Sequence, residues 1–205
     1  MKYGFAIDLS MCMGCHTCSV ACKQNNNLPN GIWWNFVRTV GGPNKDTASG
    51  TFPNVSMYHL PVNCQHCDNA ACVEVCPTGA SYKREDGLVL INQEECIGCE
   101  SCRTACPYDV RTLYPTELLY SVDFAVGDAD APVHVGGIVG KCTGCYHRVD
   151  RGEVPACMEL CPGRARYWGD LDDPESDVSK FLASGVAAER LIEEAGTGPN
   201  VYYVH

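Results

Sequence analysis

Sixteen cysteines, arranged in four groups of four, constrain this chain more than any other feature of its sequence. The first group has the spacing C-x2-C-x2-C-x3-C, and the third repeats it with a proline after the last cysteine. The second group widens one interval to four residues, and the fourth contains an eleven-residue excursion. The groups, called boxes one to four in chain order, are Cys12, Cys15, Cys18 and Cys22; Cys64, Cys67, Cys72 and Cys76; Cys96, Cys99, Cys102 and Cys106; and Cys142, Cys145, Cys157 and Cys161.

Three kinds of framework use cysteines in such numbers: disulfides, structural zinc and iron–sulfur clusters. Disulfides are typical of small secreted domains, but they do not account for the proline that follows three of the four boxes. Zinc sites use two C-x2-C pairs with a longer loop between them. The bacterial ferredoxin spacing C-x2-C-x2-C-x3-C-P gives three thiolates to one cluster and the fourth to its neighbour. The spacing therefore predicts 4Fe–4S clusters, with each fourth cysteine expected at the start of a helix.

Boxes two and three are close enough in the sequence to form one unit. Residues 77–95 separate them and contain a predicted hairpin, in which Tyr82–Arg84 and Leu88–Ile91 flank the turn Glu85–Gly87. Boxes one and four lie outside this unit and are therefore expected to pair with each other. The sequence thus predicts an α+β fold of two interleaved ferredoxin-like units, each binding two 4Fe–4S clusters, with loop and hairpin insertions.

The boundaries of the units follow from this nesting. Alternating apolar residues at about 115–138 predict an extra hairpin within the outer unit. Residues 170–195 hold eight acids against two basic residues and are interpreted as a solvated surface segment. The predicted units are 63–106 for the inner unit, 1–62 with 107–169 for the outer unit, and 170–205 for an acidic C-terminal tail.

The ferredoxin rule for the fourth cysteine assigns all sixteen cysteines to four sites. His16 and His66 lie inside boxes but are not expected as ligands, because sixteen thiolates already satisfy four clusters. No catalytic triad, phosphate-binding loop or flavin motif is present, so no catalytic residue is predicted. The predicted ligands are Cys12, Cys15, Cys18 and Cys161 for site 1; Cys22, Cys142, Cys145 and Cys157 for site 2; Cys64, Cys67, Cys72 and Cys106 for site 3; and Cys76, Cys96, Cys99 and Cys102 for site 4.

The likeness to a known family extends beyond the cysteines, to the segments YGFAIDLSMCMGCHTCSVACK, KREDGLVLINQEECIGC and PNVYYVH. With the order of its boxes, the chain resembles the four-cluster ferredoxin-type iron–sulfur subunit of dimethyl sulfoxide reductase-like molybdopterin oxidoreductases. The resemblance implies a non-catalytic subunit that relays single electrons through four 4Fe–4S clusters, between a quinol-oxidising membrane partner and a molybdopterin catalytic subunit. It also implies that site 1 lies nearest the molybdenum and site 4 nearest the membrane partner.

Charge and hydropathy limit the partners and the location of the chain. A net charge of −10 argues against a nucleic-acid partner. The chain is expected to have no signal peptide or transmembrane segment of its own, since no positive n-region with an apolar h-region is seen and its apolar runs are shorter than the roughly 20 residues that span a bilayer. The resemblance implies export with the catalytic partner, so the chain is expected on the outer face of the cytoplasmic membrane, held there through its partner subunits. Three other functions remain open: an electron-transfer subunit of a formate dehydrogenase or hydrogenase, a stand-alone soluble polyferredoxin, and a zinc-stabilised interaction module.

Eight basic residues are expected near the clusters, where a cation or a hydrogen bond to sulfur raises the reduction potential. A solvated positive surface explains any single one of them equally well. These residues are Lys83, Arg84, Arg103, Lys141, Arg148, Arg151, Arg164 and Arg166.

Overall fold

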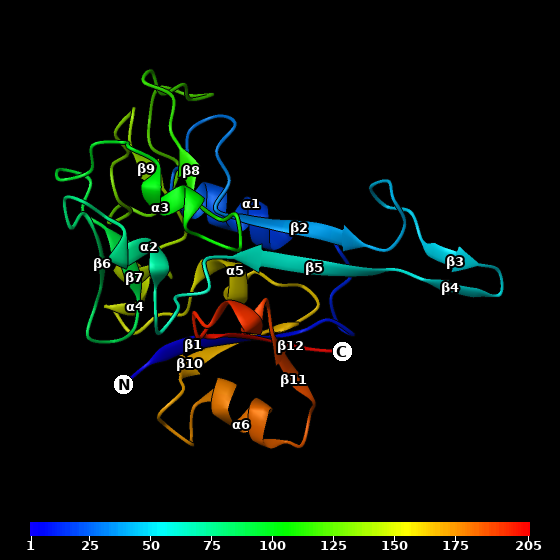
Figure 1. The fold of residues 1–205 in the computed structure, drawn as a ribbon. Coiled ribbons are helices and arrows are strands. Elements are labelled where there is room, and N and C mark those ends of the chain that lie inside the picture. The colour runs from blue at the N-terminus through cyan, green and yellow to red at the C-terminus, as the bar shows by residue number, and fades with distance from the viewer.

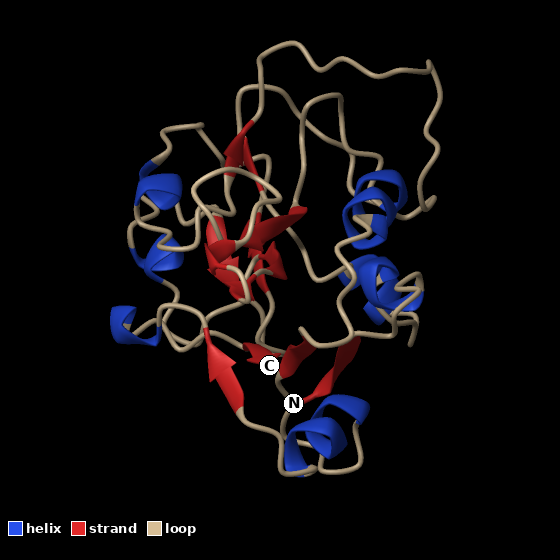
Figure 2. Cartoon of the chain, turned by 90° about the vertical axis from the view of Figure 1, so that its right-hand side faces the viewer, coloured by secondary structure: helices blue, strands red, loops and turns tan.

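The computed structural model describes residues 1–205 and confirms an α+β chain, built from small sheets and short helices (Figure 1). Strands occupy the centre of the molecule, with short helices on either side of them (Figure 2). None of the helices combines the length and the apolar character that crossing a bilayer requires. The helices are α1 (Thr17–Asn25), α2 (Ala71–Glu74), α3 (Ser101–Thr104), α4 (Tyr146–Val149), α5 (Ala156–Glu159), α6 (Asp177–Ala183) and the 3-10 turn η1 (Glu193–Ala195). The strands are β1 (Tyr3–Asp8), β2 (Asn35–Val40), β3 (Ser49–Thr51), β4 (Asn54–Ser56), β5 (Tyr58–Asn63), β6 (Ser81–Lys83), β7 (Val89–Ile91), β8 (Thr112–Leu113), β9 (Val139–Gly140), β10 (Arg166–Asp170), β11 (Ala188–Arg190) and β12 (Val201–Val204).

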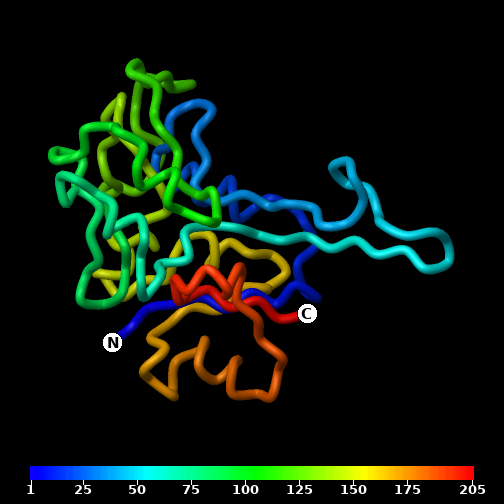
Figure 3. The backbone as a smooth tube through the Cα atoms, viewed as in Figure 1, coloured from blue at the N-terminus to red at the C-terminus, as the bar shows by residue number.

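The widest sheet joins the first strand to the last. Its strand order is β10-β1-β12-β11, with β12 parallel to β1 and the other neighbours antiparallel. Figure 3 shows the N-terminal and C-terminal segments running beside each other at this sheet. Phe5 of β1 is paired with Val201, and Ile7 with Tyr203, and all four side chains are buried. The first and last strands therefore share one hydrophobic face.

The prediction of an acidic tail at 170–205 is wrong for much of that range. The segment forms α6, whose N-cap Ser176 accepts the Ser179 N–H, and it supplies both β11 and β12 to the sheet. The acidic side chains lie at the surface. Val178 and Val201, in the same C-terminal segment, are fully buried. The prediction was based on the acidic residues, which lie on the exposed face of the segment, and took no account of the few apolar residues that are buried.

A two-stranded ribbon extends from the body of the molecule. β2 pairs with β5 from Asn35↔Asn63 to Val40↔Tyr58, and the exposed hairpin β3–β4 continues the ribbon outward (Figure 1). Its outer end carries Phe52, which is 86% exposed. The cysteine pattern does not predict this ribbon, but its buried end leads directly into box two.

The hairpin predicted between boxes two and three is confirmed. β6 and β7 pair antiparallel, with Ser81 opposite Ile91 and Lys83 opposite Val89. The Asp86 carboxylate stabilises the turn, because it accepts the Leu88 N–H at 3.1 Å. This hairpin lies between the two boxes that the sequence places in the inner unit.

The hairpin predicted at about 115–138 is wrong, because that range contains no strand. Only the two-residue strands β8 and β9 pair, and they lie just outside it. The backbone of the segment instead bonds to the loop at the end of α1, where Asn30 N–H donates to Leu119 O and Asp128 N–H donates to Asn25 O. Because the Leu119 carbonyl and the Asp128 amide bond to residues 25–30, they are not available for strand pairing within 115–138, although the apolar residues alternate there.

Every box has its third cysteine in a short helix. In boxes two to four the fourth cysteine lies two residues after that helix ends, and in box one it lies within α1. The prediction that the fourth cysteine starts a helix is therefore wrong. In three boxes a glycine with positive φ (Gly14, Gly98 or Gly144) turns the backbone between the first two cysteines. In boxes two to four the helix that carries the third cysteine is only four residues long, so the fourth cysteine lies beyond its end.

Two hydrophobic clusters form the core, and cysteines belong to both. The first packs Phe5, Trp168 and Tyr203 from the four-stranded sheet around two cysteines. The second centres on Trp34 and Tyr114, joined by a 2.9 Å hydrogen bond from the indole N–H to the phenol oxygen, and contains three cysteines. The interior is thus built around the cysteine boxes.

Candidate metal centres

The cysteines predicted for site 1 surround one cavity. The segment after β1 carries the first two, α1 carries the third, and the segment after α5 carries the fourth. Gly14 has φ +69°, and a Cβ on it would lie 2.5 Å from the His59 ring, so only glycine fits this turn. The cavity is lined by Cys12, Cys15, Cys18 and Cys161.

The cysteines predicted for site 3 surround a second cavity. Burial, reinforced by the neighbouring Cys64 sulfur, raises the pKa of the Cys67 thiol to about 12. Such a thiol stays protonated at neutral pH unless a metal centre binds to it. The hydroxyls of Tyr108 and Thr197, which also line this cavity, are 2.6 Å apart. Its cysteines are Cys64, Cys67, Cys72 and Cys106.

The cysteines predicted for site 2 are all buried. Burial raises the pKa of each of these thiols, and for Cys22 the next causes are the sulfurs of the other three. The Asn26 Nδ2 group lies 3.7 Å from the Cys22 sulfur and 3.9 Å from the Cys145 sulfur. A single amide therefore faces sulfurs from boxes one and four.

Site 4 reaches the surface at Cys99, which is exposed. Ser81 N–H donates to the Cys76 sulfur at 3.4 Å, and the Cys99 sulfur is 3.5 Å from Ser101 Oγ. The hydrogen bond with Ser101 is the main cause of the lowered pKa of Cys99, and the nearby Cys76 thiol opposes it. Within the predicted set Cys76 and Cys96 are partly buried, and Cys102 is buried.

The sites follow one another in the order 1, 2, 3, 4. Cys18 of site 1 and Cys157 of site 2 pack in the first hydrophobic cluster, and Cys142 of site 2 and Cys64 of site 3 pack in the second. Arg111 donates to the Cys72 sulfur of site 3 and to Ser81 Oγ, and the Ser81 N–H donates to the Cys76 sulfur of site 4. The only exposed cysteines are Cys15, in site 1, and Cys99, in site 4. The two ends of the row therefore reach the surface.

Hydrogen-bond donors face the sulfurs of the inner sites. Arg111 Nη2 donates to the Cys72 sulfur at 2.9 Å, and Gly144 N–H donates to the Cys142 sulfur at 3.4 Å. His66 Nδ1 accepts the Val89 N–H at 3.0 Å, which leaves the proton on Nε2, 3.9 Å from the Cys142 sulfur. Donors to sulfur suit thiolates that hold a negatively charged iron–sulfur group.

The cysteine sets surround spaces and do not converge on a point. No group of three His, Cys, Asp or Glu side chains is placed to hold a single metal ion. In sites 1 and 3 the four sulfurs line the wall of a cavity, and its other lining residues are mostly apolar. Four soft thiolate ligands around a space of this kind fit the predicted 4Fe–4S group.

The structure separates the eight basic residues predicted near the clusters. Only Lys141 and Arg166 are buried. Arg164 is exposed and the other five form ion pairs with carboxylates, at Lys83, Arg84, Arg103, Arg148 and Arg151.

Sequence reasoning missed Arg111, a third buried cation. A signal for it exists, because Arg111 follows Cys106 in the pattern C-P-x3-R and Arg166 follows Cys161 in the same pattern. The inward-facing Asn26 was also missed, and nothing in the sequence around it marks it.

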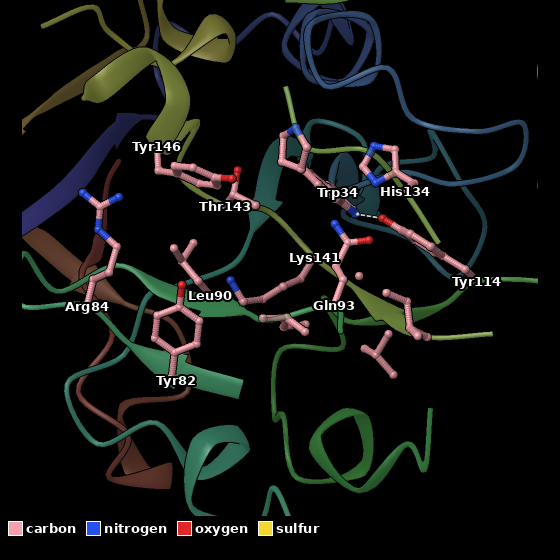
Figure 4. Close-up of a pocket in the computed structure, with 15 residues that line it drawn as sticks. Trp34, Tyr82, Arg84, Leu90, Gln93, Tyr114, His134, Lys141, Thr143 and Tyr146 are labelled. Atoms are coloured by element: carbon pink, nitrogen blue, oxygen red, sulfur yellow. Dashed lines mark hydrogen bonds between the residues drawn. The ribbon is translucent and has the colours of Figure 1, made fainter. Parts of the chain in front are cut away.

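A further cavity, of 180 Å³, contains no cysteine. It lies between the β6–β7 hairpin and the segment before β9, and Trp34, Tyr82 and Tyr114 are among its lining residues (Figure 4). Figure 4 also shows the Lys141 side chain reaching toward Leu90. The Lys141 ammonium group is already engaged, since it donates to the backbone oxygens of Val89 and Cys142.

Comparison with known proteins also indicates iron–sulfur clusters. The family described as 4Fe-4S dicluster domain matches residues 55–117 and 131–171. A dimethyl sulfoxide reductase iron-sulfur subunit of Halobacterium salinarum is 45% identical over 211 residues, which are 100% of this chain and 79% of the relative. The arsenate respiratory reductase iron-sulfur subunit ArrB of a Shewanella species is 40% identical, over 100% of this chain and 96% of its own length. A polypeptide of the anaerobic dimethyl sulfoxide reductase of Escherichia coli is 38% identical, over 84% of this chain and 75% of its own length.

Proposed function

This protein belongs to the family of iron–sulfur subunits of dimethyl sulfoxide reductase-type molybdoenzymes, and we propose that it relays single electrons along a row of four 4Fe–4S clusters. The family consists of electron-transfer subunits of reductase complexes, distinct from the catalytic subunits. A 4Fe–4S cluster held by four thiolates takes up and releases one electron at a time. The positions of the cysteines in the fold support such a relay.

The observation that carries the proposal is a continuous row of cysteine sets with exposed ends. Cys18 of site 1 packs in one hydrophobic cluster with Cys157 of site 2, and Cys142 of site 2 packs in the other cluster with Cys64 of site 3. The cysteines of site 2 are buried, whereas Cys15 is exposed in site 1 and Cys99 in site 4. Such a row exchanges electrons with partners at its ends and shields the middle from solvent.

The ligand sets of the proposal are those that the ferredoxin rule assigns, with an inner folding unit inserted into an outer one. Two cavities support the rule, because each combines three cysteines of one box with the fourth cysteine of another. The Asn26 amide, 3.7 Å from the Cys22 sulfur and 3.9 Å from the Cys145 sulfur, supports it for site 2. For site 4 the rule alone makes the assignment.

The partners are proposed from the ends of the row and from the family. Met11 and Met13, beside site 1, are 52% and 60% exposed, and Ile97, beside site 4, is 66% exposed. Exposed apolar side chains of this kind suit buried contacts between subunits. We assign the molybdopterin catalytic subunit to the site 1 end and a quinol-oxidising membrane subunit to the site 4 end. These partners hold the protein at the outer face of the cytoplasmic membrane.

Cys102→Ser in the assembled complex is the test of the relay. The substitution removes one ligand from site 4 only, so we expect turnover driven by a quinol to fall by at least tenfold. Turnover with a small artificial donor that delivers electrons nearer site 1 is expected to continue. Both rates are measured on the same purified complex.

Thr104→Ala, on the same helix, is the matched control and should leave both rates unchanged. Equal loss of both activities in Cys102→Ser, with the complex intact by size-exclusion chromatography, would contradict a linear relay that begins at site 4.

Cys161→Ser tests the ligand sets themselves. Because Cys161 lines the cavity with Cys12, Cys15 and Cys18, its loss should alter the electron paramagnetic resonance signal that Cys12→Ser also alters. The single variants Cys22→Ser and Cys145→Ser should each alter the same second signal, different from the one that Cys161→Ser alters. If Cys161→Ser and Cys145→Ser changed the same signal, the interleaved arrangement would be wrong.

A further inference from the structure

The interior of this acidic protein carries an excess of positive charge. The net charge of the protein is −10. Among its buried residues, however, there are three basic side chains (lysine or arginine) and only one carboxylate. The carboxylate, Asp86, is paired with Arg84 at 2.6 Å. None of the three cations, Arg111, Lys141 and Arg166, forms a salt bridge, although each is at most 4% exposed. The fold therefore buries three positive charges for which it offers no carboxylate.

Arg166 lies between sites 1 and 2. Its guanidinium lines the site 1 cavity, and its Nη1 is 3.7 Å from the Cys157 sulfur of site 2. Two buried amide oxygens, of Asn35 and Asn63, hold it at 3.2 and 3.3 Å. Burial lowers the pKa of Arg166, but the Cys157 and Cys18 sulfurs outweigh this effect and the pKa is raised. Sulfurs of two sites thus supply its negative surroundings.

Lys141 lies between sites 2 and 3. Its ammonium group donates to the carbonyl oxygen of Cys142, a site 2 residue, at 2.7 Å. It also donates to the carbonyl oxygen of Val89, which lines the site 3 cavity. Two neutral carbonyls fix the position of the ammonium group without neutralising it.

Arg111 lies between sites 3 and 4. Its Nη2 donates to the Cys72 sulfur of site 3 at 2.9 Å and to Ser81 Oγ at 2.8 Å. The same Ser81 donates its backbone N–H to the Cys76 sulfur of site 4 at 3.4 Å. The Arg111 Nη1 is buried and has no hydrogen-bond partner within the protein. A buried guanidinium nitrogen without a partner indicates a negative group that the side chains do not provide.

We propose that Arg166, Lys141 and Arg111 are shared counter-cations, one in each gap of the row, and that each stabilises negative charge on the two sites it separates. The proposal rests on the four-site relay and adds residues that control how electrons distribute along it. Burying an unpaired cation is strongly unfavourable, and an anionic group on either side of it removes that penalty. Each reduction adds one negative charge to a site, so a nearby cation favours the reduced form and raises the potential.

The test replaces each cation by a neutral residue of similar size in the full-length protein: Arg166→Gln, Lys141→Met and Arg111→Gln. Each variant is purified anaerobically and titrated against potential, with the four sites followed by electron paramagnetic resonance. For each variant we expect the ratio of reduced to oxidised protein to fall about tenfold at the two adjoining sites, equivalent to about 59 mV for one electron. The ratio at the two distant sites should stay unchanged.

Two controls separate charge from shape. Arg103→Gln removes a cation next to Cys102 that is half exposed and paired with Glu100, and it should not shift any site. Arg166→Lys and Arg111→Lys keep the charge and should keep the potentials, or restore iron content if the Gln variants lose it. A uniform shift of all four sites, no shift at all, or Lys variants as defective as the Gln variants would overturn the proposal. An error in the four-site relay itself would be recognised separately, because the unmutated protein would then show a number of redox-active sites other than four.

Discussion

Chelating iron from the full-length protein under anaerobic, reducing conditions is expected to abolish its native fold. The helices that carry the third cysteines of boxes two, three and four have four residues each. Isolated helices shorter than about 12 residues are marginal in water. Both hydrophobic clusters contain cysteines, and the buried cations between the sites lose their negative partners when the metal leaves. Metal binding and folding are therefore coupled.

The measurement is far-ultraviolet circular dichroism together with urea unfolding, before and after chelation. Reductant without chelator is the control and should leave both unchanged, and addition of ferrous iron with sulfide should restore the starting spectrum. A protein that kept its native spectrum and its cooperative urea transition after complete iron loss would contradict the coupling.

Truncation before Thr197 is expected to destabilise the fold by more than about 5 kcal/mol, a large part of the ~5–15 kcal/mol stability of a typical domain. The truncation removes β12, with Val201 and Tyr203 buried at 0% and 2% exposure. Burial of each such side chain contributes about 1.5–3 kcal/mol. It also removes Asn200, whose backbone N–H donates to Gln65 O and whose side chain donates to His66 O. These bonds tie box two to the four-stranded sheet.

The readouts are the midpoint of urea unfolding and the iron content of the purified protein. Removal of His205 alone is the matched control, since that residue is exposed and lies outside β12. The prediction is wrong if the longer truncation unfolds at the same urea concentration as this control and retains its iron.

Much of the candidate site could be predicted, because metal ligation imposes fixed spacings on a sequence. The four boxes indicated iron–sulfur chemistry, and the turn between Tyr82 and Leu90 indicated the hairpin that the structure confirms. The grouping of the sixteen cysteines into four sites remains a prediction, which the two cysteine-lined cavities and the Asn26 amide beside the Cys22 and Cys145 sulfurs support.

The errors come from interactions between distant segments, which local patterns do not contain. The apolar alternation at 115–138 is real, but the segment bonds to residues 25–30 and forms no ladder of its own. The acids of 170–195 mask the buried Val178, and the pairing partner of β12 is the first strand of the fold. Arg111 was overlooked because burial, which distinguishes it from the surface cations, is a property of the folded state.

The parallel pairing of β1 with β12 delays completion of the four-stranded sheet until the end of this sequence order. β1 leaves the ribosome before every other strand of this fold, yet one of its two neighbours in the sheet is the strand made last. Contacts between residues so far apart form late, after the intervening residues are in place. The four-stranded sheet is therefore completed only after all four cysteine boxes have been synthesised, because β12 follows Cys161 in the chain.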